Sequence, residues 1–242
     1  MRQGQLVDQD FFGSAYWCVV SGEVISDGLG ARGPLTTVGV DVARSGNDKT
    51  IMALRHGNRI QELRESFHQH TMATTGLLVG ILAANPGARG IVDADGLGVG
   101  VFDRARERGH NVAAFHAGVK TQKTDRTKEL GFINERAAVW WALREALDPA
   151  YDPVIELPPD DLLLGELTAP RWMVASNARI QIEAKDEIRK RLHRSTDRAD
   201  AVVMAFWQEH KRRKARMHDT RLKPLPEPRS PYPDPVRVEL EW

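Results

Sequence analysis

The segment VGVDVARSGNDKT, residues 38–50, decides the fold because it joins a strand, an acid and a turn. A short apolar run leads to Asp41, and the turn sequence SGND follows at residues 45–48. Strand interiors disfavour aspartate. Strand formation therefore does not explain the presence of Asp41, and we take it as a candidate functional residue.

Two further apolar runs extend this segment into an antiparallel meander. The chain continues as TIMAL (50–54), turns at HGN (56–58) and returns as RIQEL (59–63). Apolar runs joined by turns that contain glycine and asparagine are typical of β-hairpins. We therefore predict a three-strand meander over residues 37–67.

A strand–helix–strand unit follows the meander. Apolar residues at helical spacing predict a helix over residues 71–84. The sequence GIVD (90–93) predicts a short buried strand, a helix over 99–108 follows a Gly-rich turn, and NVAAF (111–115) predicts the next strand. Strands joined through a helix in this way are parallel. The pattern predicts an α/β fold in which a mixed central sheet, made of the antiparallel meander and parallel strands, is flanked by helices.

The rest of the chain is predicted to be mainly helical. We expect helices over residues 134–147, 160–167, 185–193 and from about 198 past 207, and a hairpin over 172–182. Asp197 is expected to cap the last helix. The two tryptophans of the 134–147 helix, Trp140 and Trp141, are expected to lie in the core.

Composition limits the class of protein and its organisation. The 242 residues carry a net charge of +1, which says nothing by itself about partners. The single cysteine, Cys18, excludes a disulfide within the chain and a cysteine zinc site, and no apolar run is long enough to cross a membrane. We predict an N-terminal strap or linker remnant (1–34), one folded domain (35–210) and a basic, then proline-rich, disordered tail (211–242).

Three acids stand at the ends of predicted elements. Asp41 lies on the first strand of the meander, Asp93 ends the strand at residues 90–93, and Asp200 lies in the first turns of the last helix. Functional groups of such sheets gather at one edge of the central strands. Carboxylates suit Mg²⁺ or Mn²⁺, and two such ions roughly 4 Å apart can stabilise the attacking and leaving oxygens of a phosphodiester. These acids are therefore predicted to be catalytic ligands of two divalent ions.

Two neighbouring acids compete with this set. Asp95 lies two residues after Asp93, but Gly96 indicates that the chain is already turning there, so Asp95 would initiate the turn or hold a metal-bound water. Asp197 lies three residues before Asp200, on the same helix face. Capping explains Asp197, and a supporting or proton-transfer role is the alternative.

Four segments in this order resemble the nuclease domain of the large terminase subunit of tailed bacteriophages. They are VGVDVARSGNDKT (38–50), IVDADGLGVGVFDRARERG (91–109), FINERAAVWWALREAL (132–147) and RKRLHRSTDRADAVVMAF (189–206). The resemblance spans residues 35–208. It implies an RNase H-like (RuvC-type) fold in which Asp41, Asp93 and Asp200 match the family's metal-binding acids.

The resemblance also implies a function and a set of partners. It implies a two-metal-ion endodeoxyribonuclease that cuts concatemeric viral DNA during genome packaging in the host cell cytoplasm. Its expected partners are double-stranded DNA, a packaging ATPase, the portal protein and the small terminase subunit. No G-x-x-x-x-G-K-[ST] loop occurs in the chain, so we expect an isolated nuclease fragment or a motor encoded on a separate chain.

Basic residues near the predicted site are candidates for DNA binding. Such side chains neutralise phosphates without reading sequence, so the affinity should fall with salt. A solvated protein surface is the alternative explanation for each of them. The candidates are Arg44, Lys120, Lys123, Arg126, Lys185 and Arg189.

Other functions remain open from sequence alone. A Holliday-junction resolvase or a transposase-like nuclease would share the fold and prefer branched DNA. A nucleotide-binding module would use Gly96–Gly100 for phosphate, although Val101 breaks the G-x-G-x-x-G pattern. A catalytically silent packaging scaffold would keep its partners after loss of all three acids.

Overall fold

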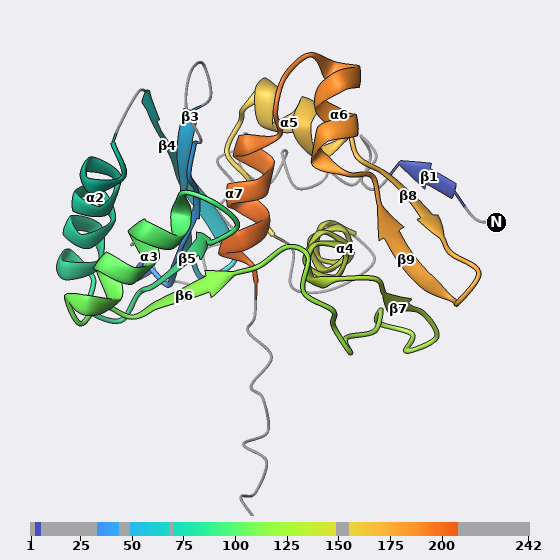
Figure 1. Ribbon diagram of the computed structural model, residues 1–242, viewed down its shortest axis with the longest axis horizontal. Coiled ribbons are helices and arrows are strands. Elements are labelled where there is room, and N and C mark those ends of the chain that lie inside the picture. Colours follow the sequence, from blue (N-terminus) through green and yellow to red (C-terminus); the bar gives the residue numbers. More distant parts are fainter. Residues whose placement is uncertain (1–2, 6–32, 44–48, 68–69, 149–154, 208–242) are drawn as a thin grey trace, which may run out of the picture. The chain divides into compact units, whose positions relative to one another are not determined.

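The computed structural model of the protein describes residues 3–5, 33–43, 49–67, 70–148 and 155–207 (Figure 1). All of them belong to one compact unit, residues 1–208. The predictions made for Cys18, Arg44 and the tail at residues 211–242 lie outside the described residues. No helix of the described residues is long and apolar enough to cross a membrane.

The central sheet has five strands in the order β4-β3-β2-β5-β6. They are β2 (Thr37–Asp41), β3 (Lys49–His56), β4 (Arg59–Phe67), β5 (Arg89–Asp93) and β6 (Val112–Phe115). β2, β3 and β4 pair antiparallel, whereas β5 pairs parallel with both β2 and β6. The predicted meander and the predicted parallel strands are both confirmed.

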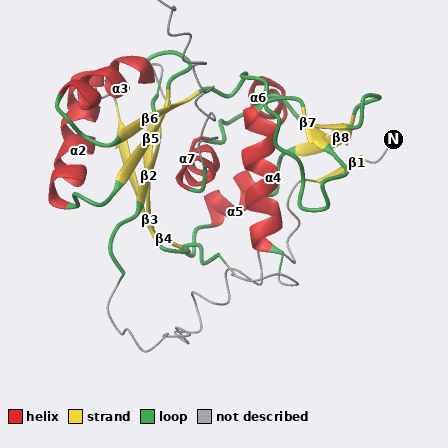
Figure 2. Ribbon diagram, turned by 90° about the horizontal axis from the view of Figure 1, so that it is seen from below, coloured by secondary structure: helices red, strands yellow, loops and turns green. Residues whose placement is uncertain are grey.

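Alternate residues of the central strands face two different cores. Val38 and Val40 of β2 pack in the core that includes residues of α2 (Thr71–Ala84) and α3 (Gly98–Glu107). Ile51 and Ala53 of β3 belong to the other core, which contains α7 (Asp197–Ala205). Figure 2 shows the sheet between α2 and α3 on one face and α7 on the other.

A second layer of helices and a small sheet lie beyond α7. The helices are α4 (Glu135–Leu147), α5 (Asp161–Leu167) and α6 (Lys185–Leu192). The small sheet has the order β1-β8-β9-β7, with strands Gln3–Gln5, Arg171–Val174, Arg179–Ile182 and Gly131–Phe132. Part of the predicted N-terminal strap thus forms an edge strand, and residues 6–32 lie outside the described residues. The sequence did not predict β7.

Two of the described helices, α4 and α5, begin at a side-chain cap. The Asn134 side chain accepts a hydrogen bond from the backbone N–H of Ala137 and begins α4, and Asp160 begins α5 in the same way. The prediction that Asp197 caps the last helix is wrong, because Thr196 occupies the cap position and Asp197 is the first helical residue. The helix also ends at Ala205 rather than beyond Trp207.

Gly39 allows α7 to lie directly against β2. A Cβ atom at Gly39 would come within 2.1 Å of the carbonyl oxygen of Ala201 and 2.6 Å of the backbone nitrogen of Ala205. Real side chains do not approach backbone atoms this closely, so any larger residue would push the helix away. Because Asp41 lies two residues further along the strand and Asp200 lies beside Ala201, this contact also sets the distance between two predicted site residues.

Replacing Gly39 by alanine should therefore destabilise the fold strongly. Backbone atoms on both sides cannot move aside, so we expect Gly39→Ala to lower the free energy of unfolding by about 3 kcal/mol or to prevent folding. The measurement is chemical denaturation followed by circular dichroism.

Gly80→Ala is the matched control, because Gly80 lies on the exposed face of α2 and a Cβ atom added there would have no other atom within 4 Å. Alanine has the higher helix propensity, so this variant should gain up to about 1 kcal/mol. Equal stability of the two variants would contradict the close packing of α7 on β2.

Candidate active site

The sheet brings the first two predicted acids together. β2 and β5 are parallel neighbours, and Val40 pairs with Val92 at the end of their register. Asp41 and Asp93 each follow at the next position, where both strands end. Side chains alternate along a strand, so these two acids share the face on which α7 lies.

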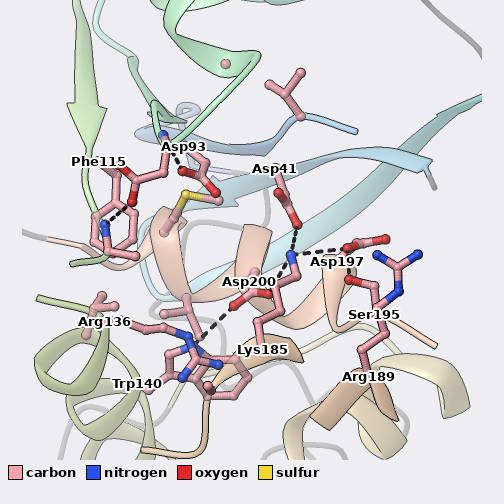
Figure 3. Close-up of a pocket in the computed structure, with 18 of the residues that line it drawn as sticks. Asp41, Asp93, Phe115, Arg136, Trp140, Lys185, Arg189, Ser195, Asp197 and Asp200 are labelled. Atoms are coloured by element: carbon pink, nitrogen blue, oxygen red, sulfur yellow. Dashed lines mark hydrogen bonds and ion pairs between the residues drawn. The ribbon is translucent and has the colours of Figure 1, made fainter. Parts of the chain in front are cut away.

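Helix α7 supplies the third acid from the opposite side. Asp200 lies in its first turn, together with Asp197. Both residues line a cavity of about 320 Å³ with the two strand acids and Asp95 (Figure 3). The structure thus gathers all five acids that the sequence singled out, from three separate parts of the chain.

The ammonium group of Lys185 lies in the middle of these carboxylates. Its Nζ is 2.9 Å from Asp41, 3.0 Å from Asp200 and 3.2 Å from Asp197 (Figure 3). We expected Lys185 to contact DNA from a charged helix, whereas the structure places it inside the acidic cavity. Among the described residues no group of three or more His, Cys, Asp or Glu side chains is arranged to hold a metal ion.

Burial and charge set the protonation of this cluster. Burial raises the pKa of Asp41 to about 8, although Lys185 partly offsets the effect. Burial also raises the pKa of Asp93. Burial would raise the pKa of Asp200 as well, but Lys185 and Arg136 outweigh it and hold that pKa below its usual value.

Lys185 owes its charge to the carboxylates around it. Burial alone would lower its pKa, but the three surrounding acids outweigh burial and hold the pKa well above its ordinary value. Lys185 is also the first residue of α6, and the N-terminal end of a helix disfavours a cation. A lysine at the first position of a predicted helix was therefore the sequence signal that could have indicated that Lys185 lies among acids.

Asp200 has additional partners that do not depend on Lys185. The hydroxyl of Thr196 donates to Asp200 Oδ2 at 2.8 Å, and the indole N–H of Trp140 donates to Oδ1 at 3.2 Å. Arg136 of α4 lies near the Trp140 ring and donates to the carbonyl oxygen of Glu183 at 2.7 Å. Trp140 was expected to be core and is buried, but its polar edge reaches the site, which helical spacing could not show.

Asp93 and Asp95 have different surroundings. The backbone N–H of Asp95 donates to Asp93 Oδ1 at 2.9 Å. The Asp95 carboxylate pairs with His116 Nδ1 at 2.9 Å and accepts from the backbone N–H of Ala117 at 2.8 Å. Asp95 thus ties the turn after β5 to the loop after β6.

Gly98 has a structural role at the start of α3. A Cβ atom there would lie 1.7 Å from the carbonyl oxygen of Asp93, so the helix begins in direct contact with the end of β5. Gly100 has no atom within 4 Å of such a position. Of the glycines considered for a phosphate loop, Gly98 therefore serves close packing beside the site.

The predicted DNA-binding residues are placed in two regions. Arg189, an exposed residue of α6, lines the acidic cavity with Lys185. Lys123 and Arg126 line a second cavity near Trp207, where Lys123 Nζ pairs with Glu135 at 2.8 Å. Lys120 is exposed in the loop after β6. Their contacts with DNA stay predictions.

Comparison with solved structures shows which known proteins share this fold. The nuclease domain of the large terminase subunit of bacterial virus Sf6 matches with a TM-score of 0.68 at 17% identity, covering 86% of this chain and 100% of that chain. A mutant of that domain with manganese and β-thujaplicinol gives 0.69 at 16% identity with the same coverage. The chain has the fold of a phage large terminase nuclease domain.

The terminase nuclease fold confirms the predicted RNase H-like mixed sheet. The large terminase nuclease of the thermophilic phage G20c matches with a TM-score of 0.50 at 14% identity, covering 73% of this chain and 83% of that chain. No protein-family model and no curated protein matches the sequence. The likeness therefore lies in the fold.

The side chains that line the acidic cavity are of the kind that binds a divalent cation, but in this structure they surround Lys185 and are not arranged as a metal site. The cavity offers carboxylate oxygens, which Mg²⁺ and Mn²⁺ prefer. Three of those carboxylates already converge on one cation, the Lys185 ammonium. A metal ion would have to replace this ammonium among the same oxygens.

Glu166 is a further acid beside the site that the sequence did not single out. It is buried on α5, and its Oε2 accepts a hydrogen bond at 3.0 Å from the backbone N–H of Ala199 in α7. Burial raises its pKa to about 7, and the charges of Asp197 and Asp200 act in the same direction. An acid inside the otherwise apolar run LLLGEL (162–167) was the available signal.

Glu166 should make the stability of the fold depend on pH. The folded protein binds this proton more tightly than the unfolded chain, whose pKa is near 4.5. The contribution to stability is therefore complete below about pH 4.5 and is lost as the pH rises through about 7.

Glu166→Gln removes this titration but keeps the shape and the acceptor. From about pH 5 to about pH 8, wild type should lose stability relative to the variant by on the order of 3 kcal/mol. The measurement is chemical denaturation at both values, with Glu129→Gln in an exposed loop as control. A pH-independent difference would contradict the raised pKa.

Proposed function

We propose that this chain is a metal-dependent DNA endonuclease, the nuclease domain of a phage large terminase subunit. It would cut concatemeric viral DNA during genome packaging in the host cell cytoplasm. The observation that supports this most directly is that Asp41, Asp93 and Asp200 line one cavity in a chain with the fold of terminase nuclease domains. The domain boundaries proposed for the nuclease are residues 35–210.

The three acids would hold two divalent ions, Mg²⁺ or Mn²⁺. A domain of Sf6 with a similar fold was solved with manganese, which supports the choice of ion. Bound ions would supply activation of water and neutralisation of charge on the departing oxygen. Asp197 would support the set from the edge of the cavity, whereas Asp95, held by His116 and Ala117, would orient the turn that follows Asp93.

The chain's own residues would position the DNA. Arg189 lines the cavity and would neutralise a phosphate beside the acids. Lys120 would contact the backbone further away, and Lys123 and Arg126 would do so from the second cavity. These contacts do not read base sequence, so cleavage would show little sequence preference. The packaging ATPase, the portal protein and the small terminase subunit are the proposed partners.

Lys185 would act as an internal cation while metal is absent. It contacts three carboxyl groups and supplies the counter-charge that they need in a half-buried cavity. Metal binding would require the ammonium to leave these oxygens, and the long lysine side chain, 35% exposed, can turn outward. Lys185 would then be free to meet a DNA phosphate at the cavity mouth.

Asp93→Asn should abolish DNA cleavage. The substitution keeps the shape of the side chain and removes the charged oxygen, so the rate of plasmid cleavage in Mn²⁺ should fall by at least about 100-fold. Asp103→Asn, at an exposed position of α3, is the matched control and should cut as wild type does.

Two results would decide against the proposal. Full activity of Asp93→Asn would show that this acid is not part of the active site. A wild type that is inactive with every divalent ion would contradict the nuclease function itself. A strong preference for four-way junctions over linear duplex DNA would instead favour a resolvase.

Lys185→Met should increase metal affinity. It removes the competing cation, so the Mn²⁺ dissociation constant measured by titration calorimetry should fall by about tenfold or more. Without metal the acids lose their counter-charge, so the variant should melt below wild type and regain more stability on adding Mn²⁺.

Lys190→Met is the matched control for this variant. Lys190 lies on the same helix, with its side chain 71% exposed and paired with Glu187. It should leave the Mn²⁺ affinity unchanged. An unchanged affinity in Lys185→Met as well would show that Lys185 and the metal do not share oxygens.

A further inference from the structure

The acids of the cavity are held in two different ways. Among the described residues, the hydrogen-bond donor to Asp41 is Lys185, at 2.9 Å. Asp200 shares the same lysine but also accepts from Thr196 and from the indole N–H of Trp140. When Lys185 leaves, Asp200 keeps two donors and Asp41 keeps none of those found in the described part of the chain.

Of the donors to Asp200, Trp140 is held more rigidly than Lys185. Its side chain is 1% exposed and packs in the main core. The Arg136 guanidinium lies 5.6 Å from the ring centre and is itself bonded to the Glu183 carbonyl oxygen. The ring is therefore enclosed by the core and by Arg136, so its N–H points at Asp200 from a fixed place (Figure 3).

The chemistry of an indole suits this place. An indole N–H donates one hydrogen bond, cannot accept one and carries no charge. It can therefore orient a carboxylate without competing as a metal ligand and without repelling a cation. An ammonium in the same position would repel the metal ion, because both carry a positive charge.

We propose that Trp140 is a positioning residue that holds the Asp200 carboxylate in place while Lys185 is exchanged for metal. The inference rests on the proposed function, since it concerns the same acids. Partners that orient metal ligands commonly change metal affinity or activity by about 10- to 100-fold when they are removed. Trp140 would thus contribute to metal binding although it lies in the core.

The neighbouring tryptophan provides a matched control. Trp141 also lies on α4, is 7% exposed, and donates its indole N–H to Glu145 Oε1 at 2.9 Å. It packs edge-on against Trp172 at 4.9 Å, on the side of the small sheet. Replacing either tryptophan by phenylalanine removes the same atoms from the same helix, but only Trp140 bonds to Asp200.

The experiment compares Trp140→Phe and Trp141→Phe with wild type in the whole chain. Mn²⁺ affinity is measured by titration calorimetry, and plasmid cleavage is measured over a range of Mn²⁺ concentrations. We expect Trp140→Phe to weaken Mn²⁺ binding by about 10-fold or more and to regain most of its cleavage rate when Mn²⁺ is raised. Trp141→Phe should match wild type within about twofold, and melting in EDTA should show that both variants fold.

Each outcome has a separate meaning. Equal Mn²⁺ affinity of two folded variants would overturn the role of Trp140 while leaving the nuclease intact. A wild type that neither binds Mn²⁺ nor cuts DNA would instead overturn the proposed function.

A second measurement keeps the inference testable if Trp140→Phe does not fold. In a ¹H–¹⁵N spectrum, the indole resonance that shifts in Asp200→Asn identifies Trp140. We expect this proton to stay protected from exchange with D₂O in both the metal-free and the Mg²⁺-saturated protein. Rapid exchange after Mg²⁺ is added would show that Trp140 releases Asp200, and would overturn the proposal.

Discussion

The electrostatic balance of one cavity governs the rest of the structure. Six aspartates and three basic side chains line it; Asp41 is buried, and three more of the aspartates are half-buried. Like charges held this close cannot all stay ionised without a cation among them. The ammonium of Lys185 meets this need with contacts to three acids. The sheet and α7 can therefore pack tightly around a site whose purpose, in our proposal, is to receive another cation.

The general form of the fold could be predicted because its signals are local. The Gly/Asn turns of the meander and the acid that ends β5 are visible within a few residues, and so is the acid in the first turn of α7. The structure places all three of these acids in one cavity. What could not be predicted is where long side chains point after the chain has folded. Lys185 and Trp140 both belong to helices that the sequence indicated correctly, yet their polar ends meet at a site formed by distant elements.

Small and apolar residues also shape the site. Gly39 sets how closely α7 approaches β2, and Gly98 sets how closely α3 approaches the end of β5. Trp140 links the core to Asp200 through one hydrogen bond. Patterns of hydrophobicity assign such residues to the interior, which is true, but burial alone does not separate a residue that fills space from one that orients a ligand.

The position of Asp200 has a consequence for biosynthesis. Helix α7 is the last element described along the chain, and it supplies both the third acid and the surface that covers the face of β2 at Gly39. A nascent chain that has not yet left the ribosome beyond α7 carries Asp41 and Asp93 on a sheet with one face uncovered. Such a chain cannot assemble the full set of acids, so the proposed site forms only after α7 has been synthesised and has packed on the sheet.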